Sequence, residues 1–367
     1  MTTHPNGKTM DIIGFSRYGG PAELKKTTAA YPHGFDASEN IVIKVHAAAV
    51  NPVDKALLSG DLKMVIPVAS FPHVICYDVA GVVEEADLGG RFSVGQPVFA
   101  RLFGSENDGR KTPWYRGAMA EYCVAHTSNV VLKPGNLTFE EAAAIPLVGM
   151  TALQVLNASE LKEGDSIFIS GGAGGVGTMA IQLAKHVFGA GLVVTTASEG
   201  EKERLCKGLG ADVVVDYKAT RFDEIYGGTN SEKFDVCFDT TGESLQMSNI
   251  VKDGGRIVTI AGMATLEELR RIGGTAWILK LFVKRRVKRE EYKAAQSRNA
   301  DWSYLFLSPS QDDLSTLAEH LESGAIKPVL DGVWDFHSED GKDGWKGAFE
   351  RSFSGRAKGK CVVQITT

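Results

Sequence analysis

The sequence predicts an α/β protein in which a β-rich first part precedes a doubly wound parallel sheet. Three observations lead to this prediction. Short β-branched runs and turns dominate the first 140 residues, and beyond them strand-like runs alternate with segments long enough for a crossover helix. A glycine-rich turn, residues 171–177, ends one of the apolar runs and opens a segment with helical spacing.

Composition describes a soluble, mildly acidic globular protein of 367 residues, long enough for two domains. A net charge of −5 makes nucleic acid or a membrane surface an unexpected main partner. The five cysteines form no CxxC pattern and are expected to be reduced thiols. The N-terminus resembles no secretion signal, and no apolar run approaches the ~20 residues of a membrane span, so a cytoplasmic location is expected.

The first 140 residues are expected to form a β-rich domain of their own. The run 41–46 alternates, the run 79–84 is typical of a strand, and a further strand begins near residue 95 after a turn. Gly81, inside the second run, indicates a close approach of another backbone.

From Thr138 the pattern changes to helix and then to α/β alternation. Thr138 and Glu141 have the spacing of a capping box, and an Ala-rich helix is predicted to run through Pro146 to Val155. Beyond it, strands of a parallel doubly wound sheet are predicted at 166–170, 191–196, 212–216, 234–239 and 255–260.

The glycine turn contains the pattern Gly172-x-Gly174-x-x-Gly177 between a predicted strand and a predicted helix. The first glycine permits a tight turn, the second lets backbone N–H groups approach a pyrophosphate, and the third lets helix and strand pack closely. Phosphate is favoured at the N-terminus of the helix. Glycine turns also serve as tight connections without a ligand, but the strand and helix on either side favour dinucleotide binding.

The end of the next strand indicates which dinucleotide binds. NAD-binding units carry an acidic residue near this point, whereas this chain has Thr195-Thr196-Ala197-Ser198. A 2′-phosphate would be repelled by a carboxylate there, and Ser198, Lys202 and Tyr217 offer it a hydroxyl, a cation and a phenol. Lys202 could also be an ordinary exposed lysine beside two glutamates. We predict NADPH as the cofactor.

Two later regions leave alternatives open. Residues 277–289 are rich in Lys and Arg with interleaved apolar residues, which fits either a patch for an acidic ligand or, as we favour, a solvated helical edge. The tail is predicted to form a helix at 314–321 and strands near 327–330 and 360–364. These strands could finish the nucleotide sheet or return to the first domain.

Several motifs occur in the order typical of one superfamily: Asn51-Pro-Val-Asp54, Gly117-Ala-Met-Ala-Glu-Tyr122, Ala144-Ile-Pro-Leu-Val-Gly-Met-Thr-Ala152, the glycine turn, Gly210-Ala-Asp212, Phe238-Asp-Thr-Thr-Gly242 and Gly355-Arg-Ala-Lys-Gly-Lys360. Over nearly its whole length the chain resembles the medium-chain dehydrogenase/reductase superfamily. Residues 76–83 and 181–187 are similar to the plant enone and alkenal reductases of its zinc-free quinone oxidoreductase group.

This resemblance implies a GroES-like catalytic domain at 1–140, a Rossmann dinucleotide-binding domain at 141–300, and a C-terminal segment, 301–367, that returns to the catalytic domain. It places the cofactor between the two domains and implies a homodimer that forms through the nucleotide sheet. Ser198, Lys202 and Tyr217 fall where the group binds the 2′-phosphate. The expected cofactor contacts also include Gly175 and Val176 of the turn, and Thr151.

The resemblance also bears on metal. The three catalytic zinc ligands of the zinc alcohol dehydrogenases correspond to Asn51, Tyr77 and Val148, a poor set of ligands, and residues 101–117 lack the four cysteines of the structural zinc lobe. No metal is therefore expected. Without a Lewis acid a plain ketone is difficult to reduce, whereas an enone or a quinone accepts hydride more easily.

Tyr77 is the predicted hydrogen-bond or proton donor near the substrate, although it could equally be an aromatic wall against the nicotinamide. Asn51 is expected to orient the substrate or the nicotinamide ribose, and Asp54 and Asp78 to support the backbone around them. His73 is expected to be a hydrogen-bonded structural residue.

These inferences predict an NADPH-dependent reductase of enones or quinones. An enoyl-thioester reductase is the enzymatic alternative, in which the basic 280–289 segment would receive a carrier or CoA phosphate. An NADPH-binding sensor or structural protein with little turnover is the alternative from another class.

Overall fold

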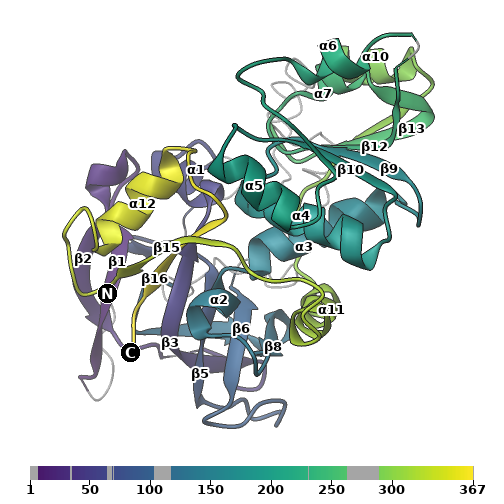
Figure 1. Ribbon diagram of the computed structural model, residues 1–367. Helices are drawn as coiled ribbons and strands as arrows, with labels where there is room; N and C mark the ends of the chain where they lie inside the picture. The colour runs from purple at the N-terminus through teal and green to yellow at the C-terminus, as the bar shows by residue number, and fades with distance from the viewer. Residues whose placement is uncertain are drawn as a thin grey trace. The chain divides into compact units, whose positions relative to one another are not determined.

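The computed structural model describes residues 7–33, 35–63, 68, 70–102, 117–229, 231–262 and 289–366. The chain forms two compact units (Figure 1). Unit 1 comprises Met1–Leu147, Ser308–Ser323 and Pro328–Thr367, and unit 2 comprises Val148–Leu307 and Gly324–Lys327. A mainly antiparallel sheet in one unit and a parallel sheet in the other confirm the predicted α/β fold class.

The main sheet of unit 1 has the order β15-β16-β3-β5-β6-β8, with β7 paired to β3 off this path. Its strands are β3 (Asn40–Val50), β5 (Asp78–Glu85), β6 (Pro97–Arg101), β7 (Tyr122–His126), β8 (Val130–Leu132), β15 (Leu330–Asp335) and β16 (Lys360–Gln364). A smaller sheet joins β2 (Lys25–Ala30), β1 (Thr9–Phe15) and β4 (His73–Val74).

Gly81 lies where β3 and β5 cross closely. A Cβ on this residue would lie 2.1 Å from the backbone oxygen of Lys44, so the predicted close approach is confirmed. The inward side chains of both sheets, including Ile43, Val79 and Phe15, are almost fully buried in one core. This core gives the polar residues at the strand ends a rigid support.

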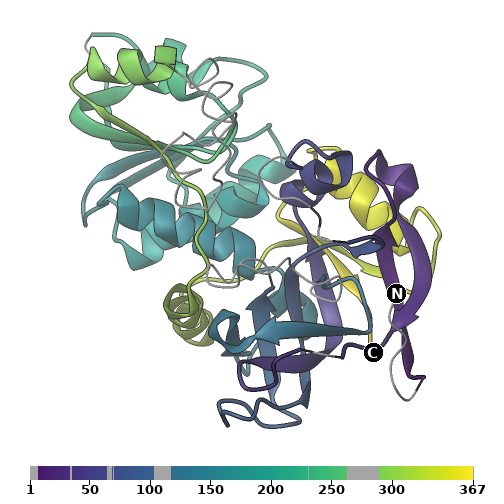
Figure 2. The same ribbon diagram turned by 180° about the vertical axis from the view of Figure 1, so that it is seen from behind.

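The C-terminal residues complete the sheet of unit 1. β16 pairs antiparallel with β3, with Val362 opposite Ala49, and β15 pairs parallel with β16. The short helical segments of this unit are η1 (Pro21–Glu23), α1 (Pro52–Ser59), η3 (Thr127–Asn129), α2 (Phe139–Ala143), α11 (Gln311–Glu322) and α12 (Trp345–Phe353). Helix α12, in yellow, lies beside α1 in both views (Figures 1 and 2).

Unit 2 is a parallel sheet of order β11-β10-β9-β12-β13-β14. Its strands are β9 (Ser166–Ile169), β10 (Leu192–Thr196), β11 (Val213–Val215), β12 (Phe234–Asp239), β13 (Val251–Thr259) and β14 (Asp301–Tyr304). Five of them match the predicted strands, although β13 begins four residues early, and β14 was not predicted. From β9 the chain first builds outward on one side and then continues on the other, which is the doubly wound arrangement.

Helices cover both faces of this sheet: α3, α4 and α5 lie on one side, and α6, α7 and α10 on the other (Figure 1). Their bounds are α3 (Pro146–Ala158), α4 (Gly175–Gln182), α5 (Glu201–Gly208), α6 (Phe222–Tyr226), α7 (Ser244–Met247) and α10 (Arg289–Gln296). A π-helical turn, η4 (Leu183–Val187), follows α4.

The prediction of one helix running through Pro146 is wrong. The structure has two helices, because α2 ends at Ala143 and Pro146 begins α3. Proline has no N–H and a fixed φ, so it suits the first turn of a helix and disrupts an interior. The predicted capping box is confirmed, since the Thr138 side chain accepts from the Glu141 N–H and the Glu141 carboxylate accepts from the Thr138 N–H.

Most of the basic 277–289 segment lies outside the described residues, so its interpretation stays a prediction. Within the parts of the chain that the structure describes, no helix is both long and apolar enough to cross a membrane.

Candidate active site

The glycine turn of unit 2 connects β9 to α4 and is held by the end of the neighbouring strand β10. The N–H of Gly171 donates to Thr196 Oγ1 at 2.9 Å, and the N–H of Gly172 donates to the Thr196 backbone oxygen at 3.0 Å. Gly171 has a φ of +66°, a left-handed conformation that glycine adopts without steric cost. The turn is therefore fixed by its own sheet.

The three glycines of the predicted pattern are needed for different reasons. A Cβ on Gly172 would lie 2.2 Å from Thr195 Oγ1, and a Cβ on Gly177 would lie 2.3 Å from the Gly171 oxygen, so both positions require glycine for internal packing. A Cβ on Gly174 would meet only the Gly171 oxygen, at 3.3 Å, among the described residues. The space beside the Gly174 backbone is therefore not filled by the described part of the fold.

Helix α4 begins directly behind that open backbone. Gly174 is its N-cap and contributes no side-chain cap, and Gly175, Val176 and Gly177 are its first three residues. The first N–H groups of a helix have no partner within the helix, and the helix dipole favours a negative charge there. This uncapped end fits the pyrophosphate of a dinucleotide.

The residues predicted to bind the 2′-phosphate follow two adjacent strands at the same end of the sheet. Thr196 of β10 is paired with Val215 of β11, and Ser198 and Tyr217 each come two residues after this pair. Ser198 is partly buried, whereas Tyr217 is 55% exposed. Lys202 lies in the first turn of α5 and is partly buried. Thus the pairing of β10 with β11 places the segments that carry Ser198 and Tyr217 next to each other.

Thr151, the remaining predicted cofactor contact, lies in the middle of α3 and is buried. Its role as a cofactor contact stays a prediction.

Asp239, a residue without a predicted role, organises the loop after β12. Its carboxylate accepts hydrogen bonds from the backbone N–H groups of Gly242 at 2.7 Å and Glu243 at 2.9 Å, and from Thr259 Oγ1 at 2.9 Å. Burial acts to raise the pKa of Asp239, but these bonds and one from Ser244 hold it below its usual value. The loop beside the glycine turn is thus anchored by a buried, ionised carboxylate.

In unit 1 the predicted site residue Asn51 is fixed from several directions. It is the N-cap of α1 and only 1% exposed. Its Nδ2 donates to Asp78 Oδ2 at 2.9 Å, its Oδ1 accepts from Lys360 Nζ, and its backbone N–H donates to Asp54 Oδ2 at 2.7 Å. Both ends of the amide are therefore already engaged inside this unit.

A buried group of charges surrounds Asn51. Burial raises the pKa of Asp54 to about 7 and also raises that of Asp78, while it lowers the pKa values of Lys360 and Arg101. Each shift is opposed by the opposite charges nearby. Two acids and two bases of this kind compensate one another and form a stiff polar support under the N-terminus of α1.

Tyr77, the predicted donor, forms a buried pair with His73. The His73 Nε2 and Tyr77 Oη atoms lie 2.6 Å apart, and the two residues are 4% and 5% exposed. Burial lowers the pKa of His73 to about 4 and raises that of Tyr77 well above its usual range. At neutral pH the imidazole is therefore uncharged and the phenol keeps its proton, so Tyr77 has the protonation state of a hydrogen-bond donor.

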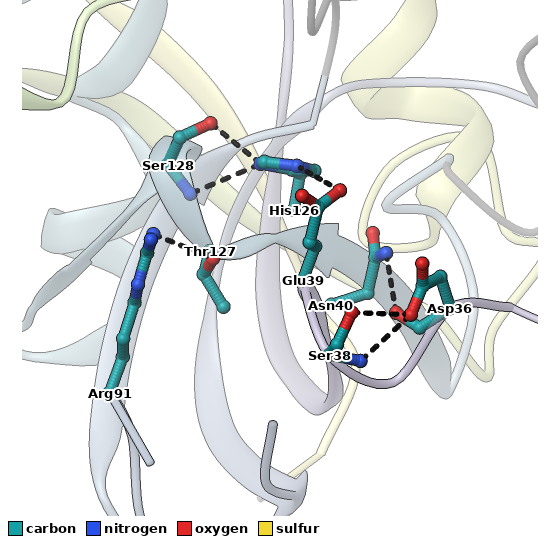
Figure 3. Close-up of polar contacts among 8 residues, drawn as sticks. All are labelled: Asp36, Ser38, Glu39, Asn40, Arg91, His126, Thr127 and Ser128. Atoms are coloured by element: carbon teal, nitrogen blue, oxygen red, sulfur yellow. Dashed lines mark hydrogen bonds and ion pairs between the residues drawn. The ribbon is translucent and has the colours of Figure 1, made fainter. Parts of the chain in front are cut away.

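A second polar cluster in unit 1 contains a serine, a histidine and a glutamate in a row (Figure 3). His126 Nδ1 lies 2.6 Å from Ser128 Oγ, and its Nε2 lies 3.4 Å from Glu39 Oε2. The same Nδ1 accepts the backbone N–H of Ser128 at 3.2 Å, and Arg91 donates to Thr127 Oγ1 at 3.0 Å. Since the imidazole lone pair caps its own turn, η3, this cluster holds the turn and is not a catalytic triad.

Among the residues that the structure describes, no group of three or more His, Cys, Asp or Glu side chains is placed to hold a metal ion. Of the positions that correspond to zinc ligands in the alcohol dehydrogenases, Asn51 and Tyr77 are engaged as described, and Val148 is an apolar residue of α3.

Comparison with known proteins agrees with this architecture. Residues 37–135 match the family model of the alcohol dehydrogenase GroES-like domain, and residues 209–363 match a model described as zinc-binding dehydrogenase. The chain is 34% identical to a 2-methylene-furan-3-one reductase of Solanum lycopersicum, over 96% of this chain and 79% of the relative.

Two further relatives extend the match. An NADPH-dependent alkenal/one oxidoreductase of Arabidopsis thaliana, a chloroplastic protein, is 32% identical over 97% of this chain and 80% of its own. The solved quinone oxidoreductase of Coxiella burnetii has a TM-score of 0.77 at 26% identity, covering 98% of this chain and all of that one.

The chain belongs to the medium-chain dehydrogenase/reductase superfamily, in its zinc-free quinone oxidoreductase and enone reductase group. This medium-chain reductase is an oxidoreductase that uses a nicotinamide cofactor and acts on a small molecule. The resemblance predicted from its motifs is thereby confirmed.

Proposed function

We propose that this protein is an NADPH-dependent reductase of α,β-unsaturated carbonyls or quinones that works without zinc. The observation that carries the proposal is the uncharged Tyr77 and His73 pair at a position where zinc dehydrogenases hold a metal ligand. The names of the tomato, Arabidopsis and Coxiella relatives point to the same class of acceptor.

The residues of unit 2 fit the cofactor that this function needs. The open backbone at Gly174 and the uncapped start of α4 suit the pyrophosphate. Ser198, Lys202 and Tyr217 supply donors and a cation for a 2′-phosphate. Their presence, with no carboxylate at the tip of β10, supports NADPH over NADH. When bound, the reduced nicotinamide supplies the hydride.

The residues of unit 1 fit an electron-poor acceptor. When hydride adds to the β-carbon of an enone, negative charge develops on the carbonyl oxygen of an enolate, and a single neutral donor can stabilise it. Tyr77, which keeps its proton at neutral pH, is proposed as that donor. A plain ketone would place a full alkoxide charge on the same oxygen, and without a Lewis acid its reduction should be slow.

The experiment that tests this function follows NADPH oxidation with a panel of 1,4-benzoquinone, 9,10-phenanthrenequinone, 3-buten-2-one, 2-hexenal and crotonyl-CoA. Turnover of the enones or quinones, unchanged by EDTA, is the expected result. Preference for crotonyl-CoA would favour an enoyl-thioester reductase. Tight NADPH binding without turnover of any acceptor would indicate a sensor or structural protein, and loss of activity with EDTA would contradict a zinc-free mechanism.

We also propose a homodimer that forms through the nucleotide sheet. β14 is the last strand in the order of that sheet, and the edge strand of a sheet is where a second copy of a chain can add its own sheet. Light scattering on the purified protein should give twice the monomer mass of 39.4 kDa. A cytoplasmic location stays a prediction, since the Arabidopsis relative is chloroplastic.

A further inference from the structure

The contact between His73 and Tyr77 is held in place by the structure around it. His73 lies in β4, where it is paired with Phe15 of β1, and the two rings meet nearly edge to face with centroids 5.4 Å apart. Its imidazole is therefore held by strand pairing and by an aromatic wall. A histidine so fixed can set the direction of a hydrogen bond.

The backbone that leads to Tyr77 is equally constrained. Cys76 has a φ of +65°, which is uncommon for a residue with a Cβ. Its backbone oxygen accepts from the Ala118 N–H at 2.7 Å, and the Tyr77 backbone oxygen accepts from the Leu102 N–H at 2.7 Å. A strained conformation held by two such backbone bonds is typical of a residue that must present its neighbour in one direction.

The charge states exclude a proton relay between the two side chains. A relay would need an imidazolium to replace the proton that Tyr77 gives up, but burial keeps His73 neutral at physiological pH. A neutral imidazole can still act as a fixed dipole. It has one N–H and one lone pair, so the position of its single proton decides what the Tyr77 hydroxyl can do.

Two proton positions are possible, and the surroundings favour one. His73 Nδ1 is buried and has no hydrogen-bond partner among the described residues. A proton on Nδ1 would leave a buried N–H without an acceptor, which is rarer in proteins than an unsatisfied acceptor. A proton on Nε2 would be donated to Tyr77 Oη across the 2.6 Å contact.

We propose that His73 is a positioning residue for Tyr77: it donates its Nε2–H to the phenolic oxygen, so that the Tyr77 proton points away from the imidazole and is available to the substrate oxygen. This inference rests on the proposed function, since it assigns a supporting residue to the donor of that reaction. It adds a role to a histidine that the sequence indicated only as structural.

The proton position can be measured without any turnover. In protein labelled with ¹⁵N-histidine, one-bond N–H coupling identifies which nitrogen of His73 carries the proton, and His73→Gln assigns the signal. A proton on Nε2, with a shift that changes in Tyr77→Phe, is the expected result. A proton on Nδ1 would overturn the proposal, even if the enzyme proves to be an active reductase.

Kinetics test the coupling to catalysis. His73→Leu should lower kcat about tenfold and leave KM for NADPH unchanged, because it disturbs a donor used in the transition state. His73→Gln, which keeps an N–H donor, should retain most of the rate. His46→Leu is the matched control, since His46 stacks on Phe139 and no described contact joins it to Tyr77.

A double-mutant cycle separates positioning from a general structural effect. In a Tyr77→Phe background, His73→Leu should change kcat less than about twofold, because two residues that act as one unit have non-additive effects. Equal losses in both backgrounds would contradict the proposal. If the wild type turns over no enone or quinone, the proposed function fails by itself, and the ¹⁵N measurement still decides the arrangement of the pair. Thermal unfolding of each variant shows whether it is folded.

Discussion

The two units build their candidate sites from different materials. In unit 2 the site consists mainly of backbone: N–H groups at the start of α4, a turn held by Thr196, and glycines where a Cβ would collide or intrude. In unit 1 it consists of buried side chains that hold one another, Asn51 with Asp78 and Lys360, and Tyr77 with His73. In the proposed function, phosphate binding therefore depends on the shape of the backbone, whereas stabilisation of the substrate's developing charge depends on the charges and proton positions of side chains.

Because of this difference, single substitutions should disrupt one site and leave the other intact. The largest effect is expected for Gly177→Ala, because its Cβ would lie 2.3 Å from the Gly171 backbone oxygen, which cannot move away cheaply. We expect that the variant either does not fold stably or binds NADPH more than about a hundredfold more weakly than the wild type. Circular dichroism and NADPH fluorescence titration would measure both.

Gly174→Ala is the matched control at the same turn. Its Cβ would meet only the Gly171 oxygen at 3.3 Å among the described residues, so the melting temperature should stay nearly constant. NADPH affinity should still fall by about tenfold if a phosphate approaches this backbone. A variant that binds NADPH as tightly as the wild type would show that Gly174 is open for another reason.

In unit 1 the largest loss is expected from Lys360→Met. Lys360 is buried and donates to Asn51 Oδ1 and to the Val50 oxygen, and its charge compensates Asp54 and Asp78. Leaving buried carboxylates without this partner should cost about 3–5 kcal/mol of unfolding free energy. Urea denaturation would measure the change.

The control for this prediction is Lys346→Met. Lys346 forms an exposed ion pair with Glu339, and removing a surface pair costs at most about 1 kcal/mol. Similar losses in the two variants would mean that the buried charges around Asn51 do not compensate one another as described.

A smaller, selective effect is expected for Lys202→Ala. If Lys202 contacts the 2′-phosphate, KM for NADPH should rise about tenfold or more, and kcat and KM for NADH should change little. Lys207→Ala, on the same helix and paired with Glu203, provides the control. An unchanged KM for NADPH would remove Lys202 from the phosphate site.

The last effect concerns pH. Burial raises the folded-state pKa of Asp54 to about 7, so the folded protein holds a proton more tightly than the unfolded chain. Stability from this group is present below the unfolded pKa of about 4 and is lost as pH rises toward 7. In Asp54→Asn the unfolding free energy should therefore fall less steeply between pH 5 and pH 7. Part of the fall should remain, because burial also raises the pKa of Asp78. A steeper fall in the variant would contradict this sign.

The arrangement of the candidate site in unit 2 can be predicted from the sequence because its determinants are local, and its role in binding a cofactor stays a prediction. Gly172, Gly174 and Gly177 lie within six residues, and Ser198 and Tyr217 follow strands whose parallel pairing brings their ends together. The six-stranded sheet was predicted except for β14, a four-residue strand in a chain segment without clear alternation. The Ala-rich pattern around Pro146 predicts one helix, but proline lacks a backbone N–H and suits a first helical turn, so the chain forms two helices there.

The site of unit 1 could be predicted only in part, since its contacts join residues that are far apart in the chain. Asn51 and Lys360 are separated by 309 positions, and no local pattern indicates their bond. His73 and Tyr77 are only four residues apart, but the left-handed backbone at Cys76 that brings them together leaves no sign in a residue that is not glycine. The tail was ambiguous because strand pairing, not composition, decides which sheet it joins.

The central proposal is that this reductase delivers hydride to the β-carbon of an enone and not to its carbonyl carbon. It is tested most directly by turnover of 2-hexenal with NADPH deuterated at the transferring position of C4, followed by mass and NMR analysis of the product. The expected product is hexanal with deuterium at C3, the β-carbon. Deuterium at C1 in an unsaturated alcohol would contradict it.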